Sequence, residues 1–196
     1  AATPPDISIA NLSQVEGNAG TTLATMTVTL NSPAPAGGVT VQYATSDAGA
    51  SAALGDYVAA SGTVSFAPGD LTQPIPITIN GDPYFEFNET VNVTLSAAVG
   101  GTIVGNIAQL TIVNDDLAPT LQVADANIVE GTGGGTTTLV FTATLSAEPA
   151  PDQPAMVDYA TASGSALAGT DFTPASSTLS FTNGTALTRT INVPIT

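Results

Sequence analysis

The chain repeats itself, and this repeat is what most constrains the fold. Blocks of the first half recur in the same order about 114 to 116 residues further along the 196-residue chain. The matched blocks are VEG (15–17 and 129–131), TTLATMTVTL with TTLVFTATL (21–30 and 137–145), VQYATSD with VDYATAS (41–47 and 157–163), LGDYVAASGTVSF with GTDFTPASSTLSF (54–66 and 169–181), and TQPIPITI with TRTINVPI (72–79 and 188–195). We therefore predict two domains of one fold, residues 1–116 and 117–196, with Pro119 in a short linker.

The matched blocks alternate apolar and polar residues and are separated by Gly, Pro, Asn and Asp. This period of two is typical of half-buried strands, and no stretch keeps the 3.6-residue period of an amphipathic helix. We predict an all-β protein of two tandem immunoglobulin-like antiparallel β-sandwiches. The strands are expected near 6–10, 21–30, 38–46, 62–67, 73–80, 90–98 and 107–113, and then near 120–124, 136–145, 155–162, 176–182 and 187–195.

The second copy ends before any counterpart of the last two strands of the first copy. We expect a second sandwich that lacks its last strands. Either the sequence given ends early, or another copy of the chain completes the sandwich by β-strand addition.

The charge of the chain excludes several classes of partner. Sixteen acidic residues face a single basic residue, Arg189, so the net charge is −15. Such a surface repels phosphate, and we predict neither nucleic-acid binding nor binding to an anionic membrane. No apolar run is long enough to insert across a bilayer. Arg189 lies on a predicted strand, where we expect it to pair with a nearby acid.

Cysteine and histidine are both absent. Disulfides, thiolate chemistry, imidazole metal sites and Ser-His or Cys-His nucleophile pairs are therefore excluded. A hydrolase built on two carboxylates would need a substrate cleft, of which the sequence gives no sign. We predict that the protein is not an enzyme.

Acidic residues gather at the strand boundaries of the first repeat. Seven of its ten acids occupy four places: Glu16; Asp56; Asp82, Glu86 and Glu89; and Asp115 with Asp116. Loops from alternate strand ends meet at one pole of a sandwich, and Glu16 reaches that pole if the first strand switches sheets near Gly17. At about 5 Å and an effective dielectric constant of about 20, each pair of like charges costs roughly 3 kcal/mol.

Two outcomes would relieve this repulsion: some acids stay protonated, or a divalent cation neutralises them. Ca²⁺ suits the set best, because it accepts six to eight oxygen ligands in adaptable geometry. The alternative for any single acid is that it merely favours a turn.

The motifs VEG, GDY, GTVSFAPGD, DPYFEFNETVNVTLS and AQLTIVNDD together resemble the Calx-beta domain. This is the calcium-binding sandwich of the regulatory regions of sodium–calcium exchangers, and it also occurs in large bacterial surface proteins. The resemblance covers the first repeat and about the first 80 residues of the second. It implies these calcium ligands: Glu16, Asp56, Asp82, Glu86, Asp115 and Asp116, with Tyr84 offering its carbonyl.

The resemblance also implies less direct ligands and a partial second site. Glu89 is the second Glu of the acidic loop and a less direct ligand, and Asn114 replaces the first of three terminal acids, which implies fewer ions or weaker binding. The second repeat keeps only Glu130 and Asp171, a possible partial second site.

We predict a non-catalytic, calcium-binding structural module of a secreted or cell-surface bacterial protein, such as a spacer, an adhesin or a fibre subunit. Calcium at the end of the first repeat is expected to stiffen the linker. The predicted partners are calcium ions, other copies of the chain through strand addition, or a surface ligand. The alternative is a carbohydrate- or protein-binding accessory module of a larger extracellular enzyme, which requires Phe85 and Phe87 to be exposed rather than packed beneath their loop. Nothing in the sequence points to a sensor within a membrane transporter.

Overall fold

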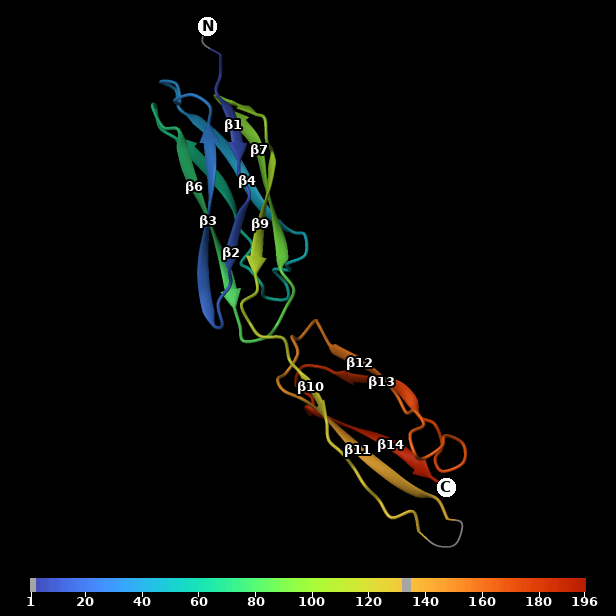
Figure 1. Ribbon diagram of the computed structural model, residues 1–196. Coiled ribbons are helices and arrows are strands. Elements are labelled where there is room, and N and C mark those ends of the chain that lie inside the picture. The colour runs from blue at the N-terminus through green and yellow to red at the C-terminus, as the bar shows by residue number, and fades with distance from the viewer. Residues whose placement is uncertain (1–2, 132–134) are drawn as a thin grey trace. The chain divides into compact units, whose positions relative to one another are not determined.

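The computed structural model describes residues 3–131 and 135–196 (Figure 1). It divides into two compact units, Ala1–Asp116 and Leu117–Thr196, called unit 1 and unit 2 below. All regular elements of the described residues are β-strands, which confirms the predicted all-β class. None of the described residues belongs to a helix with the length and apolar character needed to cross a membrane.

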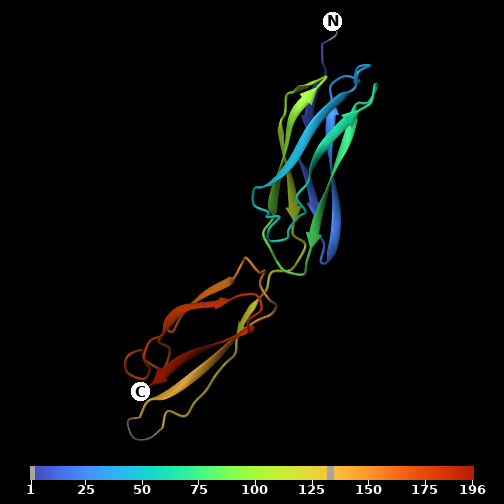
Figure 2. The ribbon, with the colours of Figure 1, turned by 180° about the vertical axis from the view of Figure 1, so that it is seen from behind.

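Unit 1 is a sandwich of two sheets that face each other (Figures 1 and 2). The first sheet has the order β6 (Thr72–Gly81), β3 (Gly20–Leu30), β1 (Asp6–Ile9) and β8 (Thr102–Ile103). The second has the order β2 (Leu12–Val15), β9 (Ile107–Val113), β7 (Glu89–Val99), β4 (Val39–Asp47) and β5 (Ser61–Phe66). The alternation read from the sequence becomes burial, because β3 buries Ala24, Met26, Val28 and Leu30 and exposes the residues between them.

The first predicted strand, residues 6–10, is the start of a segment whose two strands, β1 and β2, belong to different sheets. β1 pairs with β3 in one sheet, and β2 pairs with β9 in the other, so the chain changes sheets at residues 10–11. The expectation that the change occurs near Gly17 is therefore wrong. At the change, the Asn11 side-chain oxygen accepts a hydrogen bond from the Gln109 N–H at 2.9 Å, which satisfies an amide of β9.

The prediction of a wholly antiparallel sandwich is wrong for unit 1. β2 runs parallel to β9, and β1 runs parallel to the short strand β8, which the sequence did not indicate. The remaining strand pairs of unit 1 are antiparallel. The parallel pairing of β2 has a consequence for the site, because parallel strands end at the same edge of a sheet.

Unit 2 repeats part of this arrangement. One sheet contains β10 (Leu121–Val123), β11 (Thr137–Leu145) and β14 (Thr188–Ile195), and the other contains β12 (Ala155–Ala160) and β13 (Ser176–Phe181). Its core includes the fully buried Phe181. β12 pairs with β13, and no second strand pairs with β12 among the described residues, whereas its counterpart β4 in unit 1 pairs with both β5 and β7.

Among the described residues, Arg189 pairs with carbonyl and hydroxyl oxygens rather than with an acid, contrary to the sequence-based expectation. Its guanidinium donates to the carbonyl oxygens of Ser180 (2.9 Å), Ala186 (2.6 Å) and Thr188 (2.9 Å), and to the Thr185 hydroxyl (3.1 Å). The same group stacks over the Phe181 ring at 5.0 Å. The only basic residue of the chain therefore holds the turn between β13 and β14.

Replacing Arg189 should reveal whether its fork geometry or its charge stabilises unit 2. We expect Arg189→Lys to lower the free energy of unfolding of the chain by about 1 kcal/mol, because lysine keeps the charge but cannot reach several carbonyls at once. Urea unfolding followed by circular dichroism measures this change. Stability equal to that of the wild type in Arg189→Lys, with a loss in Arg189→Gln, would show that charge alone matters.

Candidate metal centre

Four segments of unit 1 come together where the strands β2, β6 and β9 end and β7 begins. Because β2 and β9 are parallel, Glu16 leaves its strand beside the end of β9, and its N–H donates to the Val113 carbonyl at 3.2 Å. The turn after Glu16 packs directly on the end of β6. A Cβ atom at Gly81 would lie 2.0 Å from the Gly17 carbonyl oxygen, so only glycine allows this close approach.

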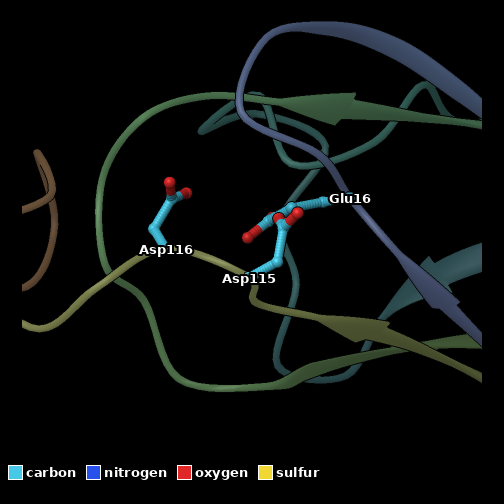
Figure 3. Close-up of side chains that lie close together, drawn as sticks. All are labelled: Glu16, Asp115 and Asp116. Carbon is cyan, nitrogen blue, oxygen red and sulfur yellow. The ribbon is translucent and has the colours of Figure 1, made fainter.

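The first acidic cluster consists of Glu16, Asp115 and Asp116 (Figure 3). Each offers one carboxylate oxygen, and these three oxygens lie within 4.8 Å of one another. Asp115 Oδ1 accepts a hydrogen bond from the Gly17 N–H at 3.1 Å, and Asp116 Oδ1 accepts one from the Asn18 side-chain amide. The other oxygen of Asp116, Oδ2, and the Glu16 Oε1 are both buried and have no hydrogen-bond partner.

The second acidic cluster consists of Asp56, Glu86 and Glu89, again with one oxygen each within 4.8 Å of the others. Asp56 Oδ2 accepts a hydrogen bond from the Ser51 N–H at 2.6 Å. Glu86 is buried, with 9% of its surface exposed, and its N–H donates to the Asn114 side chain at 3.1 Å. The structure thus includes Glu89 as a full member, although the sequence made it the less direct ligand.

The acids of the two clusters are close enough to interact electrostatically, and Glu16 shows this interaction. Only 4% of the Glu16 surface is exposed. Its pKa is raised from 4.5 to about 7, first by burial and then by four neighbouring charges, those of Glu86, Asp82, Asp116 and Asp115. Members of both clusters therefore act on one carboxylate, and the group as a whole favours either a proton or a cation.

Two predicted ligands, Asp82 and Tyr84, lie outside both clusters. Asp82 Oδ1 accepts a hydrogen bond from the Tyr84 N–H at 2.9 Å, which closes a local turn. Asp82 is nevertheless close enough to Glu16 to raise its pKa. The Tyr84 carbonyl as a ligand stays a prediction.

Asn114 has a role that the sequence did not reveal. It stood out only as the position where an acid of the terminal run is missing. In the structure its side-chain oxygen accepts from the Glu86 N–H, its side-chain amide donates to the Asp116 carbonyl at 3.0 Å, and its main-chain N–H donates to the Asn88 side chain at 3.1 Å. A carboxylate could accept from Glu86 but could not donate to Asp116, so the amide ties the two clusters together.

In unit 2, Glu130 and Asp171 line the same cavity, which has a volume of about 490 Å³. Glu130 is exposed, and Asp171 Oδ2 accepts a hydrogen bond from the Leu167 N–H at 2.7 Å, as Asp56 does from Ser51. Within the described part of unit 2, no three acidic side chains come as close together as those of the two clusters of unit 1. The partial second site therefore stays a prediction.

The aromatic pair beside Glu86 differs from its expected packing. Phe87 is 71% exposed, and its ring lies edge-to-face against that of Phe85, with centroids 5.8 Å apart. Of the two arrangements that the sequence allowed, packing beneath the loop is wrong for Phe87. This exposure is the one observation that favours the accessory binding role.

The residues of the two clusters fit a calcium ion. All six side chains are carboxylates, which are hard oxygen ligands, and Ca²⁺ accepts six to eight such oxygens in adaptable geometry. A bound cation would also satisfy the buried oxygens of Glu16 and Asp116 that have no partner. The arrangement is that of a β-sandwich module with a candidate site for a hard cation at one end of unit 1.

Comparisons with known proteins agree with this class. The family model of the Calx-beta domain matches residues 6–116 and again residues 118–196, so the chain belongs to the Calx-beta domain family. The apo form of the Calx CBD1 domain is 26% identical, with a TM-score of 0.51, over 58% of this chain and 99% of that one.

Two tandem structures match nearly the whole chain. CBD12 from CALX1.2 is 22% identical over 97% of this chain and 75% of that one, with a TM-score of 0.51. The calcium binding domain CBD12 of CALX1.1 is 23% identical over 95% and 74%, also with a TM-score of 0.51. At these identities the two tandem structures support the fold alone. No curated protein sequence matches the chain.

The raised pKa of Glu16 predicts an unusual pH dependence of the calcium-free protein. Between about pH 4.5 and 7 the folded protein holds a proton on Glu16 that the unfolded chain has released. The free energy of unfolding should therefore fall as the pH rises through this range, by on the order of 2 kcal/mol after allowance for solvent screening.

Urea unfolding in chelator at several pH values between about 5 and 8 measures this fall. Glu16→Gln should flatten it, because glutamine does not titrate. The control Asp125→Asn, which removes an acid from unit 2, should keep it. A slope in Glu16→Gln equal to that of the wild type would contradict the assignment.

Proposed function

We propose that unit 1 binds calcium ions through its two acidic clusters and that the bound ions stabilise the sandwich at this end. The observation that carries this proposal is the buried Glu16 carboxylate, which has one oxygen without a partner and lies beside Asp115 and Asp116. Burial of such a group is costly unless a proton or a cation neutralises it. Membership of the Calx-beta family supports the cation, since one of the similar structures is described as a calcium binding domain.

We assign the ligand set to the members of the two clusters, with Asp82 close enough to contribute its charge or to join them directly. Asn114 holds Glu86 and the Asp115–Asp116 segment in one arrangement. Neutralising the repulsion would also fix the chain at the end of unit 1, which suits a spacer or fibre segment that must stay stiff.

The proposed setting is the outside of a bacterial cell, in a secreted or surface protein. The composition supports this: an acidic surface with one basic residue and no cysteine tolerates a calcium-rich, oxidising medium. Extracellular modules bind calcium with dissociation constants of about 10⁻⁴–10⁻³ M, in keeping with the calcium levels found there. Non-catalytic binding is proposed because only carboxylates, hydroxyls and the backbone offer chemistry.

Strand addition by a second copy of the chain is a proposal about partners. The β12 edge, which has no second strand among the described residues, is where an added strand would pair, in the way that β7 pairs with β4 in unit 1. Size-exclusion chromatography and electron microscopy should then show dimers or longer polymers at high protein concentration. A particle that stays monomeric at all concentrations would argue against it.

Calcium should raise the melting temperature of the chain by several degrees. A ligand at 100 times its dissociation constant adds about 2.7 kcal/mol to the stability of the folded state. Thermal unfolding followed by circular dichroism, in calcium, in magnesium and in chelator, measures the effect. Magnesium should do less, because it requires stricter octahedral geometry.

The double variant Asp82→Ala, Asp115→Ala should lose the calcium response. The control Asp125→Ala, Asp152→Ala, which removes two acids from unit 2, should keep it. A melting curve of the wild type that is the same in calcium and in chelator would remove the proposal.

A further inference from the structure

The loop that carries Asp56 is fastened to its neighbours on two sides. It leaves β4 after Asp47 and returns to the core at Tyr57. The Ala50 N–H donates to the Thr90 carbonyl of β7 at 3.1 Å, and the Asn80 N–H of β6 donates to the Asp56 carbonyl at 3.0 Å. These bonds place the main chain of the loop beside Glu86 and Glu89, its partners in the second cluster.

A side-chain hydrogen bond closes the base of this loop. The Tyr57 hydroxyl donates to Asp47 Oδ1 at 2.6 Å, and the same oxygen accepts from the Ala52 N–H at 3.2 Å. The Tyr57 ring is buried, with 2% of its surface exposed, so the core fixes where the hydroxyl lies. A bond from a fixed hydroxyl to a charged oxygen is short and strong, and this one joins two residues that are ten positions apart in the chain, at the two ends of the loop.

Neither Tyr57 nor Asp47 belongs to an acidic cluster. The bond between them therefore cannot be explained as part of the ion-binding set itself. It holds the segment from which the Asp56 carboxylate projects toward two other negative charges, an arrangement that repulsion opposes whenever no ion is bound.

Unit 2 provides an internal comparison. By the repeat, Phe172 stands at the position of Tyr57, Ser163 at that of Asp47, and Asp171 at that of Asp56. The main-chain arrangement is kept, because Phe172 bridges to Ile195 as Tyr57 bridges to Ile79.

A local hydrogen bond within the loop also has a counterpart in unit 2. The Ala168 N–H donates to the Ser163 hydroxyl at 2.9 Å, as the Ala52 N–H donates to Asp47. The bond between phenol and carboxylate has no counterpart there, because Phe172 has no hydroxyl and Ser163 has no carboxylate. It is therefore not needed to form the loop.

We propose that Tyr57 and Asp47 are positioning residues for calcium, and that their hydrogen bond holds Asp56 ready to bind the ion together with Glu86 and Glu89. This inference rests on the proposed calcium binding of unit 1. A ligand held in its binding geometry before the ion arrives loses less conformational freedom on binding. Residues that orient metal ligands in this way typically change metal affinity by about 10- to 100-fold when they are replaced.

Isothermal titration of the whole chain with calcium chloride tests the proposal. Tyr57→Phe, which installs the residue that unit 2 uses, should weaken calcium binding by about tenfold, the lower end of that range. Its melting temperature in chelator should change much less than its melting temperature in calcium. The matched control is Tyr43→Phe, the same chemical change on β4 outside the loop, which should bind calcium like the wild type.

A double-variant cycle with Asp47→Ser separates this role from a simple loss of charge. If the two residues act through one bond, Tyr57→Phe should have no further effect once Asp47 is serine. Asp47→Asn, which keeps an oxygen that can accept from the hydroxyl, should retain most of the affinity.

Three results would overturn the inference: wild-type affinity in Tyr57→Phe, equal weakening in Tyr43→Phe, or independent effects of Asp47→Ser and Tyr57→Phe. Absence of calcium binding in the wild type would instead show that the proposed function itself is wrong.

Discussion

Like-charged carboxylates are held together at one end of unit 1, although each would be better solvated if they were apart. Glu16 shows the strain most clearly, because burial and four neighbouring acids raise its pKa to about 7. Burial of the apolar core offsets the free-energy cost of bringing these carboxylates together. Residues such as Ile77, Val93 and Leu110 are fully buried in that core. The acids lie where the strands end, so the rigid part of the fold determines how close they must be.

The features that bring the clusters together are small details of the chain path. The chain changes sheets between β1 and β2, at residues 10–11, which places Glu16 beside the end of β9. Gly81 lets the turn after Glu16 rest on β6, and Asn114 donates and accepts so that it ties Glu86 to Asp116. Each of these features positions a carboxylate, and none of them is assigned to the ligand set itself.

The two repeats show how one scaffold can carry different chemistry. The turn between β13 and β14 in unit 2 is held by Arg189, whereas Gln73, at the matching position in unit 1, donates to Asp70 at 2.9 Å. The loop of Asp56 has the Tyr57–Asp47 bond. The loop of Asp171 keeps the main-chain bridge, from Phe172 to Ile195, and has the Ser163 hydroxyl as an acceptor in place of the Asp47 carboxylate. Backbone geometry is thus common to both units, while the side chains that stabilise it differ.

The all-β class, nearly all the strand positions and the family could be predicted from the amino-acid sequence, because burial of one face of each strand imposes the alternation with a period of two and because the motifs recur in the second repeat. The sequence also singled out the acids, since so few charges occur elsewhere. Only the tertiary structure decided how they group, with Glu89 beside Asp56 and with Asp82 outside both clusters. It likewise decided the parallel pairing of β2, the exposure of Phe87 and the carbonyl partners of Arg189. The grouping of the acids and the pairing of β2 depend on contacts between residues far apart in the chain, and the partners of Arg189 depend on how the turn between β13 and β14 folds, which a pattern of apolar and polar residues does not encode.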